Sequence, residues 1–204
     1  NKKGGIDNFK KYDEFDYYFY TDQNIKSNKW NVIKVPLKNK LDHIDANRAT
    51  AKYYKWYHIP KELNWYDFIL HIDCARLRYL KDITPNYINN LINKNKEKSF
   101  IGRKHPKLNN IQEECKYVKG KVDNKIYVSN WENKLKKENF NQKEHIETCV
   151  FLRNLKDNNL TKILQEVYNT LMKNKLKRDQ LVFNYVLQKN NFNNLSIDNL
   201  FSSF

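Results

Sequence analysis

Two aspartates close apolar runs of the chain, at the points where strands are expected to end. Asp73 follows the apolar run 66–72, and Asp22 follows the aromatic run 17–20. A carboxylate at the carboxyl end of a buried strand is placed to hold a divalent cation, and the cation would neutralise a diphosphate. An aspartate that only caps the next turn is the alternative at both positions, and at Asp22 it is the stronger one.

Several cations share one face of a predicted helix. Arg48, Lys52 and Lys55 are four and three residues apart, and His58 follows them. Such a stripe is either a solvated face or a phosphate clamp, because arginine offers a bidentate fork and lysine a point charge. A further basic group, Arg103–Pro106, follows a short predicted strand, and an ordinary surface turn explains it equally well.

The segment Arg178-Asp179-Gln180 begins the last predicted helix. An aspartate near a helix N-terminus is favoured by the helix dipole, whereas an exposed one can act as a base toward a sugar hydroxyl. The chain has 4 Gly and neither a GxGxxG nor a GxxxxGK motif, so P-loop ATPases and Rossmann dehydrogenases are poor candidates.

The elements that must position these residues alternate between strands and helices. This order predicts an α/β sheet covered on both faces, with ligands at the carboxyl ends of its strands. Residues 1–190 are expected to form one domain and residues 191–204 a C-terminal tail, while 123–139 is ambiguous. Strands are predicted at 16–22, 30–35, 66–73, 99–102 and 147–152, and helices at 45–60, 84–93, 109–119, 159–173 and 178–188.

Composition fits a single globular domain. The chain has 204 residues, a net charge of +15, and 11 Phe, 14 Tyr and 4 Trp, which together can bury a large core. The charge is weak evidence for a polyanionic partner, because the lysine codons are A/T-rich. No apolar run is long enough to span a membrane. Cys74, Cys115 and Cys149 lack CxxC spacing and are expected to be free thiols.

The order of these motifs resembles a glycosyltransferase-like family, that of the plant seed-mucilage and turgor-regulation proteins, which has bacterial and giant-virus relatives. The resemblance covers about residues 4 to 190. It rests on the aromatic run ending in Asp22, the helix from Asn47 to His58, the strand ending in Asp73, Gly102–Pro106 with Glu113-Glu114, the strand Cys149–Arg153, and Arg178-Asp179-Gln180.

That family is similar to the GT-A glycosyltransferases, and the resemblance implies a GT-A-like, Rossmann-like fold with a twisted, mostly parallel sheet flanked by helices. The family's first strand would precede Gly4, so this chain is expected to lack it. The implied activity moves a sugar from a nucleotide-diphosphate sugar to a glycan or another hydroxyl acceptor.

The resemblance also implies roles for single residues. Asp73 and Asp179 would be catalytic, and Asp73 would also hold a divalent Mn or Mg ion, although the family's following Gly-Asn is here Cys74-Ala75. The residues expected to bind the nucleotide sugar are Asp22, Arg48, Lys52, His58, Lys104, His105, Arg178 and Gln180.

Two other functions remain open from the sequence. One is a non-catalytic module that binds an anionic polymer, nucleic acid or glycan, through the net positive charge; the other is a degenerate transferase fold. Nucleic acid is the less favoured partner. The chain starts without Met or a signal peptide and is interpreted as a piece of a longer protein. A cytoplasmic location, which could be that of a virus-infected host cell, is favoured over secretion.

Overall fold

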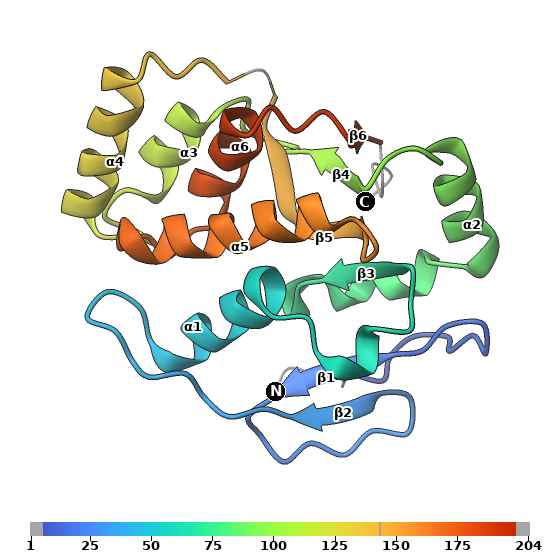
Figure 1. The fold of residues 1–204 in the computed structure, drawn as a ribbon. Coiled ribbons are helices and arrows are strands. Elements are labelled where there is room, and N and C mark those ends of the chain that lie inside the picture. The colour runs from blue at the N-terminus through green and yellow to red at the C-terminus, as the bar shows by residue number, and fades with distance from the viewer. Residues whose placement is uncertain (1–5, 143, 199–204) are drawn as a thin grey trace.

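The strands form two separate sheets. The computed structural model describes residues 6–142 and 144–198. A parallel pair of strands lies apart from a four-stranded sheet (Figure 1), with the order β3-β5-β4-β6 in the larger sheet. The strands are β1 (Tyr18–Thr21), β2 (Asn31–Lys34), β3 (Phe68–Ile72), β4 (Phe100–Lys104), β5 (Ile146–Asn154) and β6 (Leu195–Ile197).

The four-stranded sheet is mixed, which corrects the expectation of a mostly parallel sheet. Strand β5 pairs antiparallel with both β3 and β4, while β4 and β6 are parallel. The carboxyl ends of β3 and β4 therefore meet the amino end of β5. Polar residues at all three ends gather at one rim of the sheet.

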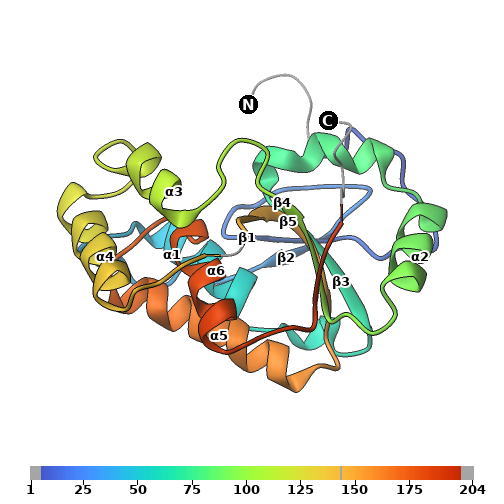
Figure 2. The same cartoon turned by 90° about the horizontal axis from the view of Figure 1, so that it is seen from above.

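Helices cover this sheet on both faces. Both views place α3 and α4 together at one end of the molecule and α2 at the other (Figure 1, Figure 2). The structure is thus α/β, with one domain. The helices are α1 (Ala46–Lys52), α2 (Pro85–Lys94), α3 (Ile111–Val118), α4 (Lys125–Lys137), α5 (Asn158–Lys173) and α6 (Gln180–Lys189), with a π-helical turn at Tyr53–Tyr57 and 3-10 helices at Lys61–Leu63 and Cys74–Asp82.

Alternating side chains of the central strands divide the core in two. Phe100 and Phe151 lie in the larger core with α3, α4, α5 and α6. Ile101, Val150 and Leu152 point to the other face and pack with α2 and the 3-10 helix that follows β3. Because successive strand residues face opposite sides, a strand that is apolar throughout must be covered on both faces.

Most of the expected elements are confirmed. The helix expected at 45–60 is α1 followed by the π-helical turn, and the 3-10 helix Cys74–Asp82 was not expected. Three more differences lie further along the chain. Arg103 and Lys104 belong to β4, so the expected basic turn begins only at His105. The ambiguous segment 123–139 contains α4, which begins after the cap Asn124. Residues 195–197, expected to be part of a tail, form β6. This strand pairs in parallel with β4 at the edge of the sheet. Residues 1–5, where the first-strand expectation falls, and residues 199–204 lie outside the described residues.

The structure bears on the cysteines and on a possible membrane span. Cys74, Cys115 and Cys149 are free thiols, as expected. Among the described residues, no helix combines the length and the apolar character that crossing a bilayer requires.

Gly102 provides a test of the sheet. A Cβ at this position would lie 2.8 Å from Cγ2 of Ile146 and 3.0 Å from Cε1 of Phe100, beside an irregularity in the β4–β5 register. We expect Gly102→Ala to lower the free energy of unfolding by about 1–3 kcal/mol through overpacking, measured by urea denaturation. In an Ile146→Ala background the same change should cost clearly less, and equal costs in both backgrounds would contradict this packing.

Candidate functional site

A cavity of about 960 Å³ lies where the two-stranded sheet approaches β3. Its wall includes β1, the helix α1 with the π-helical turn, the whole of β3, and the dipeptide Lys177-Arg178. Aromatic side chains make up much of the wall, and charged groups gather at the rim where β3 ends. The aromatic residues are Phe15, Tyr17, Tyr18, Phe19, Tyr20, Trp30, Tyr54, Tyr66 and Phe68.

The helical segment on one side of the cavity has a precise start and an unusual end. Asp45 caps α1 by accepting a hydrogen bond from the backbone N–H of Arg48 at 2.9 Å. After Lys52 the helix widens into the π-helical turn, which ends where His58 N–H bonds the carbonyl of Tyr53. Such π-turns are frequent at functional sites. Here the turn buries Lys55.

Asp179 is the centre of a buried ion-pair cluster. Its carboxylate accepts from Lys52 at 2.7 Å, from Lys55 at 3.1 Å and from the indole N–H of Trp56 at 3.1 Å. Trp56 in turn stacks on Phe151 with ring centroids 5.1 Å apart. The residue is 3% exposed and does not cap α6 with its side chain. The start of α6 therefore also connects this helix to Lys52, Lys55 and Trp56, which lie far away in the sequence.

Asp73 forms the exposed end of the same cluster. Lys55 donates to both of its carboxylate oxygens, at 3.1 and 3.3 Å, and Nε2 of His71 lies 2.9 Å from Oδ1. Its backbone N–H is held by the carbonyl of Cys149 at 2.8 Å, which continues the β3–β5 ladder. About a third of the Asp73 side chain is exposed, and it lines the cavity.

The cluster separates the protonation states of its members. Burial alone would raise the pKa values of both aspartates, but Lys52 and Lys55 hold that of Asp179, and Lys55 and His71 that of Asp73, well below the ordinary range. Burial lowers the pKa of His71 to about 4. At neutral pH His71 is therefore neutral, and its Nε2–H donates to the Asp73 carboxylate.

Arg178 links the cavity to a second polar cluster. Its Nε donates to the fully buried Glu114 at 2.9 Å, and Glu114 also accepts from Nε2 of His145 at 3.3 Å. Nε2 of His105 lies 3.9 Å from the same carboxylate. Burial lowers the pKa of His105, while Glu114 opposes that change.

The structure brings together five of the residues proposed from the sequence and leaves the others apart. Arg48, Lys52, Asp73 and Arg178 line the cavity, and Asp179 lies behind its wall. His58 stacks on Tyr53, and His105 joins the Glu114 cluster. The remaining candidates, Asp22, Lys104 and Gln180, are not among the residues that line the cavity.

The residues present do not form a cation site by themselves. Asp73 supplies one carboxylate, which already accepts from Lys55 and His71. Over residues 6–142 and 144–198, no three His, Cys, Asp or Glu side chains are grouped to hold a metal ion. Divalent cations of the Mg class need several oxygen ligands, so the side chains that the structure describes at this rim do not fit the expected Mn or Mg.

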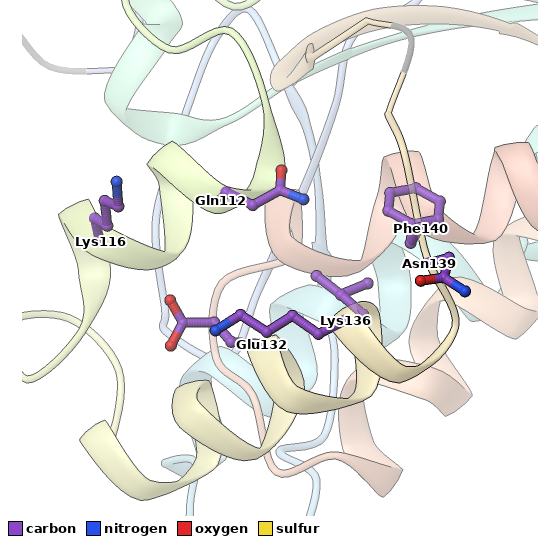
Figure 3. A pocket seen from close by; sticks show the side chains of 7 residues that line it. Gln112, Lys116, Glu132, Lys136, Asn139 and Phe140 are labelled. Carbon is purple, nitrogen blue, oxygen red and sulfur yellow. The ribbon is translucent and has the colours of Figure 1, made fainter.

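A smaller groove of about 490 Å³ lies between α3 and α4. Figure 3 shows Gln112 and Lys116 on α3, and Glu132 and Lys136 on α4, along its sides. Glu132 is paired with Lys119 at 2.6 Å, so its charge is already balanced. The groove is lined by only seven described residues, whereas the larger cavity gathers the buried ion-pair cluster, so the larger cavity is the candidate site.

Three residues at the site lie outside the set that the sequence predicts to act there. Lys55 belongs to the cationic stripe of the predicted helix, and the structure shows that it bridges both aspartates. His71 alternates with apolar residues of β3, and Arg153 stands at the end of an apolar run of β5. A charged or titratable residue inside an apolar strand was the available signal in both cases.

The comparisons with known proteins add no relative. No family model, no curated protein and no solved structure matches this chain. The resemblance to a glycosyltransferase-like family therefore stays a prediction that rests on the motifs themselves.

The Asp179 cluster predicts a large cost for one neutral substitution. Asp179→Asn leaves Lys52 and Lys55 without their shared buried carboxylate, and we expect a loss of about 3–5 kcal/mol in the free energy of unfolding. Asp45→Asn is the matched control, because it keeps the cap and removes only an exposed pair with Arg48. It should cost less than about 1 kcal/mol. Equal effects in denaturant titrations would contradict the cluster.

His71 predicts a pH dependence of stability. It is neutral in the folded protein down to about pH 4 but becomes protonated in the unfolded chain below about pH 6.5. The unfolded state therefore binds more protons in this window, and stability falls as the pH falls. Because about a quarter of the side chain is exposed, we expect a loss of about 2 kcal/mol between pH 7 and 4. His71→Gln should remove that part of the slope, and an unchanged slope would refute the assignment.

Proposed function

We propose that the protein is a glycosyltransferase that binds a nucleotide-diphosphate sugar in the cavity beside β3. The observation that carries this proposal is the convergence of Asp73, Lys52, Lys55 and Arg178 at one end of an aromatic-walled cavity. A cavity of this size accommodates a nucleotide-sized ligand. Aromatic walls suit a base and a sugar ring, and the cations suit a diphosphate.

In this proposal the acceptor hydroxyl forms a bond to the anomeric carbon while the bond from that carbon to the diphosphate oxygen breaks. The electron pair of the breaking bond moves onto the diphosphate, and the proton of the acceptor hydroxyl passes to solvent water. Lys52 and Arg178 stabilise this developing negative charge, because both line the cavity. The buried carboxylates of Asp179 and Glu114 fix the positions of their cationic groups. Arg48, exposed at the mouth, attracts the donor from solution.

Asp73 acts on the sugar side of the reaction. Its low pKa makes it a weak base, so it is poorly suited to removing the acceptor proton. A permanently ionised carboxylate instead stabilises the positive charge that develops at the anomeric carbon. Lys55 and His71 keep its oxygens oriented toward the cavity rim.

Asp179 has a positioning role in this proposal. Its carboxylate is buried and already accepts three hydrogen bonds, so it fixes the ammonium groups of Lys52 and Lys55 rather than touching the acceptor. The described side chains at the rim do not form a ligand set for a metal ion, so the proposed charge stabilisation comes from Lys52, Arg178 and Asp73.

Charge reversal at Arg48 tests the proposed site. Arg48→Glu should abolish binding of uridine, guanosine or cytidine diphosphate in calorimetry, because the charge at the cavity mouth then repels the diphosphate. Lys173→Glu changes the net charge identically but lies at the exposed end of α5, and it should leave binding unchanged. Asp73→Asn should keep binding and lower sugar transfer by about a hundredfold or more.

Two outcomes would replace the proposal. Equal losses for Arg48→Glu and Lys173→Glu, together with affinity for polyanions that falls steeply with salt, would favour the anionic-polymer module. Binding of nucleotide diphosphates without any transfer that depends on Asp73 would favour a degenerate transferase fold.

A further inference from the structure

Arg153 is a buried cation without an acidic partner in the described part of the chain. Its side chain comes from β5, lines the cavity, and is part of a residue only 6% exposed. Nη1 donates to the carbonyl of Lys55 at 3.3 Å, while Nε is buried without a hydrogen-bond partner among residues 6–142 and 144–198. Burial lowers the pKa of the guanidinium to about 10, and the group remains charged at neutral pH.

Tyr20 is a second unpartnered donor in the same cavity. Its hydroxyl is buried on β1 and has no hydrogen-bond partner within the described ranges. Burial raises the pKa of its phenol above the ordinary value, so the hydroxyl keeps its proton at neutral pH. The ring stacks on Tyr54, with centroids 5.8 Å apart.

Both donors lie against one π-helical turn. Tyr20 stacks on Tyr54, and Arg153 bonds the carbonyl of the next residue, Lys55. Buried polar groups are nearly always hydrogen-bonded, so two unsatisfied donors beside the same turn call for an acceptor supplied from outside the chain. An arginine edge together with a phenol hydroxyl matches the oxygen atoms of a phosphate group.

The charge balance of the cavity gives this pair a particular importance. Lys52 and Lys55 are offset by Asp73 and Asp179, and Arg178 is offset by Glu114. Arg153 has no such counterion among the described residues. Within residues 6–142 and 144–198, the buried part of the site therefore carries one positive charge that no acidic side chain pairs with.

We propose that Arg153 and Tyr20 form a phosphate subsite inside the cavity, with Arg153 supplying the charge and Tyr20 a neutral donor. The inference rests on the proposed function for the source of the phosphate, which is the diphosphate of the sugar donor. The same chemistry would accept a free inorganic phosphate or pyrophosphate.

The subsite has a signature that a structural arginine would not show. Burying an unpaired charge destabilises a folded protein, so removing it should leave the protein at least as stable. Functional sites commonly combine such local instability with binding. Arg153→Met should therefore keep or raise the melting temperature and weaken ligand binding at the same time.

The experiment measures binding of pyrophosphate and of uridine, guanosine and cytidine diphosphates by calorimetry, with melting temperatures in parallel. Arg153→Met should weaken the binding of pyrophosphate and of a nucleoside diphosphate by about tenfold or more. Tyr20→Phe should weaken both by about fivefold without lowering the melting temperature. Arg78→Met is the matched control, because Arg78 is exposed and does not line the cavity, and it should change neither.

The outcomes separate this inference from the proposed function. Pyrophosphate binding that depends on Arg153, with no added affinity for any nucleoside diphosphate and no sugar transfer, would uphold the subsite and refute the transferase. Unchanged binding in Arg153→Met, or equal losses in Arg78→Met, would overturn the subsite. If Arg153→Met does not fold, Arg153→Lys decides, since it keeps the charge without the fork and should still weaken binding severalfold.

Discussion

The buried carboxylate of Asp179 is the interaction on which the rest of the site depends. It joins the start of α6 to the helical segment 52–56 through two lysines and an indole N–H. A buried carboxylate destabilises the folded protein unless it is paired and hydrogen-bonded, so these contacts are expected to form together. Their formation fixes the π-helical turn against β5, where Trp56 stacks on Phe151. The cavity wall is therefore a consequence of electrostatics as much as of apolar packing.

The same cluster determines which charges the cavity presents at its rim. The ammonium group of Lys55 is shared between Asp179 and Asp73. A change at the buried Asp179 carboxylate therefore also alters the electrostatic environment of Asp73 at the rim. Burial alone would lower the pKa of Lys55, but the two carboxylates outweigh burial and raise it. Lys55 therefore keeps its proton. The rim of the cavity therefore presents an ionised Asp73 beside a neutral His71 at neutral pH.

Much of the fold could be predicted from the sequence because its signals are local. Asp45 and Thr84 cap the helices that follow them, and the apolar runs before Asp22 and Asp73 are strands. The direction of β5 could not be predicted. A buried strand has the same apolar pattern whether it runs parallel or antiparallel to its neighbours. The environment of Asp179 was equally hidden, since its partners lie more than a hundred residues earlier in the chain.

The reversed direction of β5 explains why so many polar groups meet at one rim. The amino end of β5 brings Glu147, paired with Arg103 and Arg76, next to the carboxyl ends of β3 and β4. The dipeptide at the start of α6 then joins two polar clusters, since Arg178 reaches Glu114 while Asp179 reaches the lysines. Neighbouring residues cannot move independently along a backbone held at a helix start. A displacement of α6 would therefore disturb both clusters at once, which makes the start of α6 the element that couples the cavity to the rest of the domain.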